Sequence, residues 1–215
     1  MKFYLIDREN WQRKEYFEHY LQQQTSFSIT NDINITVLME NLKKKNLKLY
    51  PAFIFMITKI VNAHQEFRTN FNAEGQLGYW EEMLPSYTIF DKQSCTFSSV
   101  WTSNFTTFTE FCTQYEQDIE TYNGTDRMFP KMPIPENNIP ISMIPWCSFT
   151  GFNLNIHNGG DYLLPIITGA QYASINGEFR LPISLQFHHA VCDGYHAGIF
   201  MNELQKLADN CAEWL

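Results

Sequence analysis

Residues 178–196, EFRLPISLQFHHAVCDGYH, predict a long strand that runs into a loop rich in titratable side chains. Successive side chains of a strand point to opposite faces, so this strand carries two unlike rows. One row is apolar and ends at His189, and it contains Leu181, Ile183, Leu185 and Phe187. The other row is polar and contains Ser184, Gln186 and His188. The two adjacent histidines therefore face different surroundings and cannot do the same work.

Further strands and helices are predicted on both sides of this strand. Runs rich in β-branched and aromatic residues predict a hairpin over 68–80 and strands over 27–37, 86–90, 96–101, 148–156 and 162–172. Helical periodicity predicts helices over 9–23, 51–66, 104–122 and from 195 onward. Pro51 suits the first turn of its helix, which is apolar nearly all round and therefore buried. The pair Asn176-Gly177 predicts a tight turn between the last two strands.

Five prolines interrupt residues 129–146, FPKMPIPENNIPISMIPW. Proline has no backbone N–H to give to a sheet, so an extended, rigid connection is predicted there instead of a paired strand. Elsewhere, strands and helices interleave without strict alternation. This order predicts an α/β fold, a two-layer sandwich of a mixed β-sheet with helices packed mainly on one face. The length suits a single domain over residues 1–215.

Composition excludes several classes of protein. The net charge of −8 argues against non-specific nucleic-acid binding, which needs a basic face. A local cluster is either a solvated helix face or a site for a small anion: Lys43, Lys44, Lys45 and Lys48. No apolar run is long enough to span a bilayer, and the first residues lack the apolar centre of a signal peptide. The five cysteines are widely spaced, so neither a disulfide framework nor a zinc site is expected, and the predicted location is cytoplasmic.

His189 ends an apolar row where a strand meets a loop. A general base in a sheltered cleft needs this placement, and an ordinary histidine pKa of about 6.5 leaves the ring mostly neutral. The alternative is a histidine at the edge of the core that makes one hydrogen bond. Asp193-Gly194 is either a simple turn or the position of a buried carboxylate, which an arginine should then neutralise.

Two other chemistries are disfavoured by the same residues. A nucleophile pair of Cys192 and His189 comes from one short loop, whereas catalytic pairs converge from distant segments. A zinc site made of His189, Asp193 and His196 lacks a recognised ligand spacing. No metal ion is therefore expected.

The motif HHAVCDGYH, residues 188–196, resembles the signature of the chloramphenicol acetyltransferase family, the trimeric type that depends on coenzyme A. Its shorter HxxxDG form is shared with the acyltransferase cores of 2-oxo acid dehydrogenase complexes. Other segments resemble the same family in the same order along the chain: NWQRKEYFEHY, KLYPAFIF, EFRTNF, PSYTIF, ISMIPW, GFNLN, DYLLPIIT and LPISLQFHH. The resemblance therefore covers nearly the whole chain.

The resemblance implies a CoA-dependent acyltransferase fold and the transfer of an acetyl group from acetyl-CoA to a hydroxyl of chloramphenicol, without a covalent acetyl-enzyme. It implies that His189 is the general base and that a hydrogen bond to its second ring nitrogen sets the tautomer. Ser142 matches the serine that stabilises the tetrahedral oxyanion. Thr168 matches a threonine that holds water near the transition state, and Asp193 and Arg13 match a structural pair. Acetyl-CoA is a co-substrate, and no permanently bound cofactor is implied.

The resemblance also implies two substrate sites and an assembly. The residues expected to line the acceptor pocket are Tyr20, Phe27, Phe97, Phe129, Phe152 and Leu154. The residues expected to contact CoA are Lys48, Tyr50, Trp146 and Tyr172. The family forms homotrimers with active sites between subunits, so the expected partner is another copy of this chain, not a nucleic acid or a membrane.

Two departures from the family pattern bear on the substrates. Residues 22–26 form a shorter, polar segment at the lip of the acceptor pocket, and Gln171 stands where many members have a lysine. The acceptor is therefore either chloramphenicol or another hydroxylated xenobiotic. One alternative is the catalytic core of a dihydrolipoyl acyltransferase, although no lipoyl-type domain or Ala/Pro-rich linker is expected. Another is a non-catalytic binding protein, against which an intact His189 and Ser142 argue.

Overall fold

The structure is a computed structural model that describes residues 1–156 and 160–215. Its larger sheet has the strand order β2-β10-β8-β7-β5-β6, with β9 paired to one end of β10. The strands are β2 (Ser26–Asn34), β5 (Leu84–Asp91), β6 (Thr96–Trp101), β7 (Asn138–Met143), β8 (Ile166–Gly169), β9 (Ala173–Ile175) and β10 (Glu178–His188). β7 is parallel to β5 and β8, and the other pairs are antiparallel, so the sheet is mixed as predicted.

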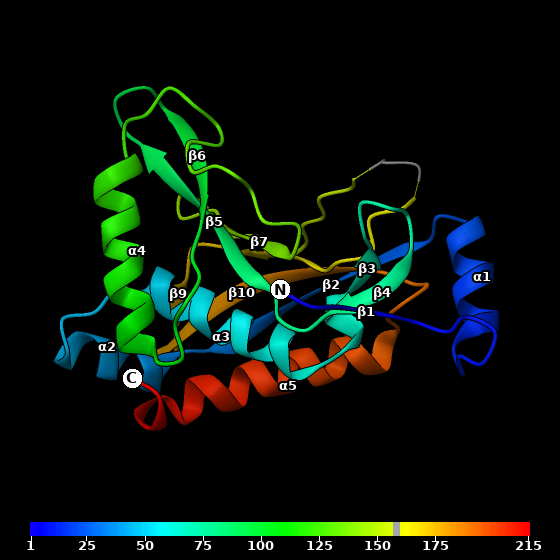
Figure 1. Ribbon diagram of the computed structural model, residues 1–215. Coiled ribbons are helices and arrows are strands. Elements are labelled where there is room, and N and C mark those ends of the chain that lie inside the picture. Colours follow the sequence, from blue (N-terminus) through cyan, green and yellow to red (C-terminus); the bar gives the residue numbers. More distant parts are fainter. Residues whose placement is uncertain (157–159) are drawn as a thin grey trace.

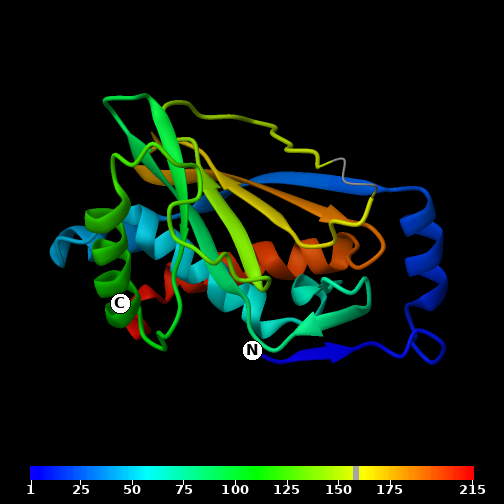
Figure 2. The ribbon, with the colours of Figure 1, turned by 45° about the horizontal axis from the view of Figure 1, so that its top comes forward.

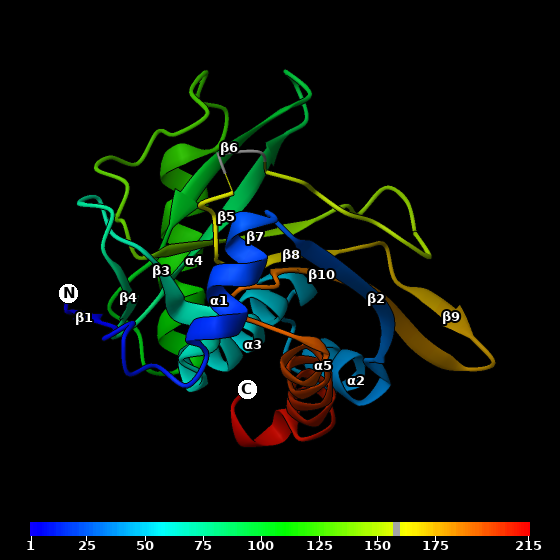
Figure 3. The same cartoon turned by 90° about the vertical axis from the view of Figure 1, so that its right-hand side faces the viewer.

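Helices cover mainly one face of this sheet (Figure 1). α3 (Leu49–Ala63) and α5 (Gly194–Asp209) run beneath it, and α2 (Thr36–Lys44) lies beside α5 (Figure 3). α4 (Phe108–Tyr122) stands at the end where β5 and β6 form a hairpin, while α1 (Lys14–Gln22) stands at the opposite end (Figure 2). The remaining helical pieces are the 3₁₀ turns η1 (Glu66–Arg68) and η2 (Cys211–Glu213). The predicted two-layer α/β arrangement is confirmed.

A smaller sheet of β1 (Phe3–Leu5), β4 (Leu77–Trp80) and β3 (Thr69–Phe71) lies beside η1. It contains the predicted hairpin, with β1 added as a third strand. Gly78 is required there, because a Cβ at this position would lie 2.4 Å from both the Phe3 ring and the Tyr4 carbonyl oxygen. The sheet therefore fixes the start of the chain against the segment that follows α3.

The hydrophobic core lies between the larger sheet and the helices. The centre of α3 is buried on all sides, as its continuous apolar pattern predicts. Phe67 of η1 joins three layers of this core, because its ring packs at 5.6 Å from that of Phe187 on β10 and at 5.2 Å from that of Phe200 on α5. The contact with Phe200 is edge-to-face, a geometry that adds to the free energy of burial.

Several predicted elements have different bounds in the structure. The helix expected over 9–23 begins only at Lys14, and the strand expected over 27–37 ends at Asn34, because α2 begins at Thr36. Residues 148–156 form no strand, so that prediction is wrong. The tight turn at Asn176-Gly177 is confirmed, since both residues have the positive φ angles, 52° and 84°, that a two-residue hairpin turn requires.

The prediction of an unpaired connection over 129–146 is wrong for its second half. Residues Asn138–Met143 form β7, a central parallel strand that contains Pro140. β8 pairs with β7 only from Ile141 onward, so Pro140 lies opposite one neighbouring strand, β5, just before the ladder with β8 begins. Ser142 is consequently held inside the sheet and not in a loop. In the described residues, no helix is long and apolar enough to cross a membrane.

Phe67→Ala should destabilise the fold by about 3–5 kcal/mol, because the ring is fully buried where η1, β10 and α5 meet. The measurement is the free energy of unfolding in urea. Phe97→Ala is the matched control, since Phe97 is 49% exposed and its loss should cost less than about 1 kcal/mol. Equal losses in the two variants would contradict the position of the core.

Candidate functional site

His189 lies directly after β10 and is held between two aromatic rings. Its backbone N–H donates to the carbonyl of Thr25 at 2.8 Å, which continues the pairing between β10 and β2 by one residue. Its ring stacks on Tyr20 of α1, with centroids 3.8 Å apart and planes inclined by 4°. The Phe27 ring of β2 packs against it at 5.2 Å. α1 and β2 therefore fix the plane of the imidazole.

The hydrogen bond that was expected at the second ring nitrogen of His189 is not found. Nδ1 is buried and has no hydrogen-bond partner in the described part of the chain. What fixes this histidine in the structure is aromatic stacking on the ring and hydrogen bonding of its backbone groups. No side chain or backbone group of residues 1–156 and 160–215 therefore sets the tautomer.

Arg13 holds the backbone of the histidine loop. Its Nε donates to the Ala190 carbonyl at 2.8 Å, and its second terminal nitrogen donates to the His189 carbonyl at 3.1 Å. The first terminal nitrogen donates to Asp193 Oδ2 at 3.1 Å. A guanidinium offers five donors in a rigid fork, so one side chain can satisfy three acceptors at once. The predicted pairing of Arg13 with Asp193 is present, and the two carbonyl contacts are an addition that the sequence could not signal.

Asp193 caps α5. Its Oδ1 accepts from the backbone N–H of Tyr195 at 3.0 Å, and His196 Nδ1 lies 3.0 Å from the same oxygen. The side chain is 37% exposed, so the expectation of a buried carboxylate is wrong. Partial burial raises the pKa of Asp193, but the hydrogen bond from Arg13 and the neighbouring His196 outweigh this effect and hold the pKa below its usual value. The carboxylate stays ionised and anchors the start of the helix.

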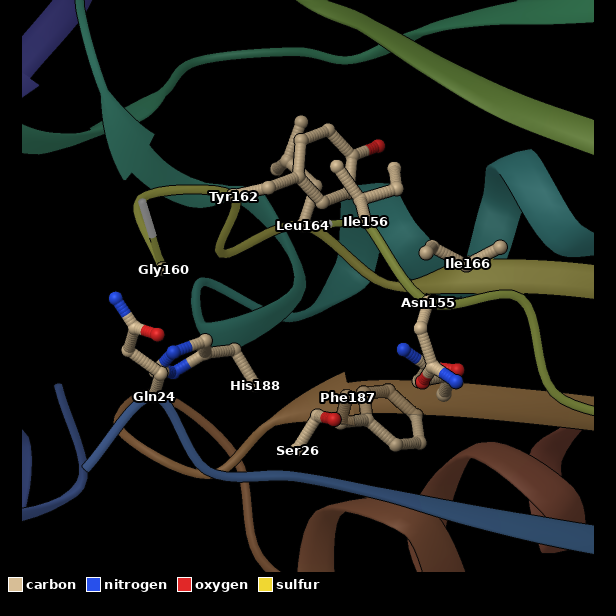
Figure 4. Close-up of a pocket in the computed structure, with 11 residues that line it drawn as sticks. Gln24, Ser26, Asn155, Ile156, Gly160, Tyr162, Leu164, Ile166, Phe187 and His188 are labelled. Atoms are coloured by element: carbon tan, nitrogen blue, oxygen red, sulfur yellow. The ribbon is translucent and has the colours of Figure 1, made fainter. Parts of the chain in front are cut away.

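His188 faces the other side of the sheet, as the alternation predicts. Its Nδ1 accepts from the Ala190 N–H at 3.2 Å, so the ring proton of its neutral form is on Nε2. Burial and the adjacent His189 lower the pKa of His188. Nε2 faces a cavity of about 60 Å³ and has no hydrogen-bond partner among the described residues (Figure 4). This cavity has room for a few water molecules but not for a substrate.

Ser142 and Thr168 form the second part of the candidate site. They lie opposite each other on β7 and β8, and their hydroxyl oxygens are 3.0 Å apart. Ser184 of β10 lies opposite Thr168 in the next ladder. Its hydroxyl donates to the carbonyl of Phe152, which holds the segment before residue 157 over the face of the sheet. Three hydroxyl side chains thus form a row across three strands.

The register of the sheet separates this row from His189. Ser142 and Thr168 are level with Ser184, and His189 follows Ser184 by five residues. A rise of about 3.3 Å per residue and two strand spacings of about 4.8 Å put His189 roughly 19 Å from Ser142. A base and an oxyanion donor that serve one reacting carbon must each come within about 3 Å of atoms bonded to it. The two side chains of one chain therefore cannot serve the same reaction centre.

The residues predicted to line the acceptor pocket fall into two groups. Tyr20 and Phe27 pack on the His189 ring. The other four lie away from that ring, on β6, on the segment that follows α4 and on the segment after β7: Phe97, Phe129, Phe152 and Leu154. Phe97, Phe129 and Leu154 are exposed large apolar side chains. A surface of this kind marks a ligand site or an interface with another subunit.

The structure brings together two of the four residues predicted to contact CoA. The backbone N–H of Gln171 donates to the Cys147 carbonyl at 3.0 Å, which joins the segments that carry Tyr172 and Trp146. Both aromatic side chains are exposed. Lys48 is exposed at the N-terminus of α3. The Tyr50 hydroxyl instead points inward, where the Thr88 N–H donates to it at 3.2 Å, so it holds α3 to β5 and is not free for CoA.

The structure supports neither the nucleophile pair of Cys192 and His189 nor the zinc site of His189, Asp193 and His196. Cys192 is buried, and burial raises the pKa of its thiol, which leaves the unreactive protonated form. Within residues 1–156 and 160–215, no group of three or more His, Cys, Asp and Glu side chains could hold a metal ion. His196, an element of the zinc alternative, is instead part of the capping box at the start of α5.

Arg13→Ala should destabilise the protein by roughly 2–4 kcal/mol, because two loop carbonyls and a carboxylate lose their donors. Arg13→Lys should recover only part of this loss, since an ammonium cannot reach three acceptors in a fork. Arg8→Ala is the control, because the Arg8–Glu18 pair is exposed and worth less than about 1 kcal/mol. Urea midpoints equal to wild type for Arg13→Ala would contradict the assigned role.

The free energy of unfolding that is lost in Arg13→Ala should depend on pH, because the pKa of Asp193 is lowered in the folded protein. A carboxyl whose pKa is lower in the folded state stabilises the fold above its unfolded pKa, about 3.9, and this stabilisation disappears as the pH falls through the folded pKa. The difference in unfolding free energy between wild type and Arg13→Ala should therefore be constant from pH 8 to about 5 and shrink below about pH 4. A difference that disappears between pH 7 and 6 would point to a histidine instead.

Comparison with known proteins identifies the family of this chain. The model of the family described as chloramphenicol acetyltransferase matches residues 1–205. A Staphylococcus aureus protein named chloramphenicol acetyltransferase is 54% identical over 215 residues, with all of both chains covered. A Clostridium perfringens protein of the same name is 51% identical over 216 residues, covering 100% of this chain and 99% of that one.

Solved structures of other proteins share the fold of this chain. One named chloramphenicol acetyltransferase has a TM-score of 0.88 at 19% identity and covers 96% of this chain and 100% of its own. A dihydrolipoamide acetyltransferase from Azotobacter vinelandii has a TM-score of 0.63 at 14% identity, covering 93% of this chain and 87% of that one. At such identities the likeness concerns the fold alone. The match of the family model and the full-length relatives, taken with the fold and the motif at 188–196, show that this chain belongs to the chloramphenicol acetyltransferase family, a family of acyl-transferring enzymes.

Proposed function

We propose that this enzyme transfers an acetyl group from acetyl-CoA to a hydroxyl of chloramphenicol, with His189 as the general base. The observation that carries the proposal is the fixed imidazole of His189, stacked on Tyr20 and set in a loop whose carbonyls Arg13 binds. The full-length relatives at 54% and 51% identity carry the name chloramphenicol acetyltransferase, which supports the choice of acceptor. This proposal makes acetyl-CoA a co-substrate and needs no bound cofactor.

The chemistry is a direct transfer of the acetyl group from the sulfur of CoA to the hydroxyl oxygen of the acceptor. The neutral ring of His189 takes the proton from the acceptor hydroxyl as that oxygen attacks the thioester carbon. The carbonyl oxygen becomes an oxyanion, to which the Ser142 hydroxyl donates. Collapse of the tetrahedral intermediate breaks the C–S bond, and the protonated histidine returns its proton to the thiolate of CoA. The products are the acetyl ester and free CoA, with no acetyl group left on the protein.

Thr168 supports the oxyanion donor. Its hydroxyl lies 3.0 Å from that of Ser142, so it can accept a hydrogen bond from the serine hydroxyl in the resting state or orient a water beside it. The serine hydroxyl is thereby held on the strand face before the substrate arrives, and a donor placed in advance costs no reorganisation during the reaction. Thr168 thus prepares Ser142 for the transition state.

The active enzyme is proposed to be a homotrimer with sites between subunits. The separation of roughly 19 Å between His189 and Ser142 within one chain, from the strand geometry, supports a site that a second copy completes. In such a site, His189 with Tyr20 and Phe27 comes from one subunit. Ser142 and Thr168 come from its neighbour, together with the half-buried Phe152 and the exposed acceptor residues Phe97, Phe129 and Leu154.

The proposal also covers CoA binding, the location of the enzyme and a second candidate acceptor. Trp146 and Tyr172 stack on parts of CoA, and Lys48 meets a phosphate, whereas Tyr50 supports the site from inside the fold. The whole chain works as one domain. Its five unpaired cysteines suit the reducing cytoplasm. Because residues 22–26 are polar, another hydroxylated xenobiotic is the second candidate acceptor.

Release of free thiol from acetyl-CoA tests the activity. Chloramphenicol should accelerate it, and His189→Ala should lower kcat by about 10³-fold or more, because the base contributes 10²–10⁴-fold. Ser142→Ala should lower kcat by about 10²–10³-fold. His188→Ala should lower it by less than about tenfold, since His188 binds only the loop backbone.

The control for this assay is acetyl-CoA without an acceptor, and a panel of other hydroxylated antibiotics separates the two candidate acceptors. If no acceptor releases thiol faster than buffer, the enzymatic proposal is wrong. If another antibiotic is turned over and chloramphenicol is not, only the acceptor is wrong. Equal losses in His188→Ala and His189→Ala would overturn the choice of base.

A further inference from the structure

A buried charge lies on the inner side of α4, far from the histidine loop. The Asp118 side chain is 10% exposed and lies 2.7 Å from the ammonium of Lys131, whose side chain is 20% exposed. Its other oxygen accepts from the Thr102 hydroxyl at 2.8 Å and from the Tyr87 hydroxyl at 3.2 Å. Burial raises the pKa of Tyr87, so its hydroxyl stays protonated and can donate. Both oxygens of the carboxylate therefore accept from at least one donor.

Lys131 belongs to the segment of residues 123–137, which runs from α4 to β7. Its carbonyl accepts from the Trp101 indole N–H at 3.1 Å, and its ammonium lies 4.7 Å from the centre of the Trp101 ring. Two more contacts join this segment to β6: the Ser99 N–H donates to the Met128 carbonyl at 2.6 Å, and the Ser98 hydroxyl donates to the Arg127 carbonyl at 2.8 Å. The segment is therefore held alongside β6.

The ion pair is distinct from the aromatic contacts that pack α4 on the core. α4 packs on the core through aromatic rings on its buried side, among them Phe108 and Phe111, which lie 5.4 and 6.2 Å from the Phe55 ring of α3. Asp118 instead reaches β5 and β6 through Tyr87 and Thr102, and reaches segment 123–137 through Lys131. Through Asp118, Lys131 thus ties segment 123–137 both to α4 and to the sheet.

Two side chains of the proposed acceptor pocket lie next to the contacts between segment 123–137 and β6. Phe129 lies two residues before Lys131 and is 43% exposed, and Phe97 lies two residues before Ser99 on β6 and is 49% exposed. Neither phenylalanine has a ring partner within the described chain that would fix it. Their position relative to each other depends on how segment 123–137 sits on β6.

We propose that the Lys131–Asp118 ion pair is a positioning device that sets the acceptor wall formed by Phe129 and Phe97, and so determines how well the acceptor binds without touching it. The inference rests on the proposed role of these two phenylalanines. A buried charge pair suits this task, because a lysine that leaves Asp118 leaves a buried carboxylate with two hydroxyl donors but without the cation that neutralises it. The pair therefore permits one position of the segment and penalises others.

The test is steady-state kinetics of the full-length enzyme with chloramphenicol and acetyl-CoA. Lys131→Met and Asp118→Asn should each raise KM for the acceptor by about tenfold, while kcat and KM for acetyl-CoA stay within about twofold of wild type. Lys131→Arg keeps the cation and should restore most of the acceptor affinity. Lys206→Met is the control, since this lysine lies exposed on α5, and it should change none of the constants.

A loss of folding is separated from a loss of positioning by the double variant Asp118→Leu/Lys131→Met. It leaves no unpaired buried charge, so its urea midpoint should remain near that of wild type. Its KM for the acceptor should still be raised by about tenfold, because the tie to the segment is gone. A wild-type acceptor KM in the double variant or in Lys131→Met would overturn the proposal.

Phe129→Ala distinguishes this inference from the proposed function. If Phe129→Ala raises the acceptor KM and Lys131→Met does not, the positioning role is wrong and the acceptor wall stands. If Phe129→Ala leaves the acceptor KM at its wild-type value, Phe129 does not line the acceptor pocket, and the positioning role of the ion pair is wrong as well. A mainly structural role for Lys131 would lower kcat and raise both KM values together, which would also contradict the proposal.

Discussion

β10 hydrogen-bonds to β2 along one side and to β8 and β9 along the other, and its register places every part of the candidate site. Ser184, near its middle, aligns Thr168 and then Ser142 in a row across the sheet. His189 follows its last residue, beyond the end of that row. A strand cannot slip by one residue without turning its buried side chains to the other face, so this separation is fixed as firmly as the core. The fold therefore keeps base and oxyanion donor apart within one chain.

The loop that carries His189 depends on groups from distant parts of the chain. Arg13 precedes α1, yet it satisfies two carbonyls of this loop and one oxygen of Asp193, while Tyr20 covers the imidazole. The base is thus placed by the N-terminal region, whereas Ser142 is placed by the centre of the sheet. Two rigid units hold the two halves of the proposed site, which is what a site shared between subunits needs.

The sequence predicted features that arise from local periodicity. The alternating row of β10, the apolar helix α3 and the Asn176-Gly177 turn all follow from one segment at a time. Pro140 misled the prediction for β7, because whether a proline costs a hydrogen bond depends on which neighbouring strand lies opposite, and only the fold shows that. The contacts of Arg13 with two backbone carbonyls could not be predicted either, because every residue type carries such a carbonyl. Ser142 and Thr168 came from the resemblance, because without it Ser142 is an ordinary serine of the predicted connection and Thr168 an ordinary strand residue.

Complementation between two inactive variants tests the shared site most directly. Chains with His189→Ala and chains with Ser142→Ala are unfolded together, refolded as a mixture and assayed for thiol release against each variant refolded alone. If base and oxyanion donor come from different subunits, some interfaces of the mixed assemblies join an intact His189 to an intact Ser142, and activity should rise far above that of either variant. If the mixture shows only the average of the two separate activities, both groups act within one chain, and the account given by the register of β10 is wrong.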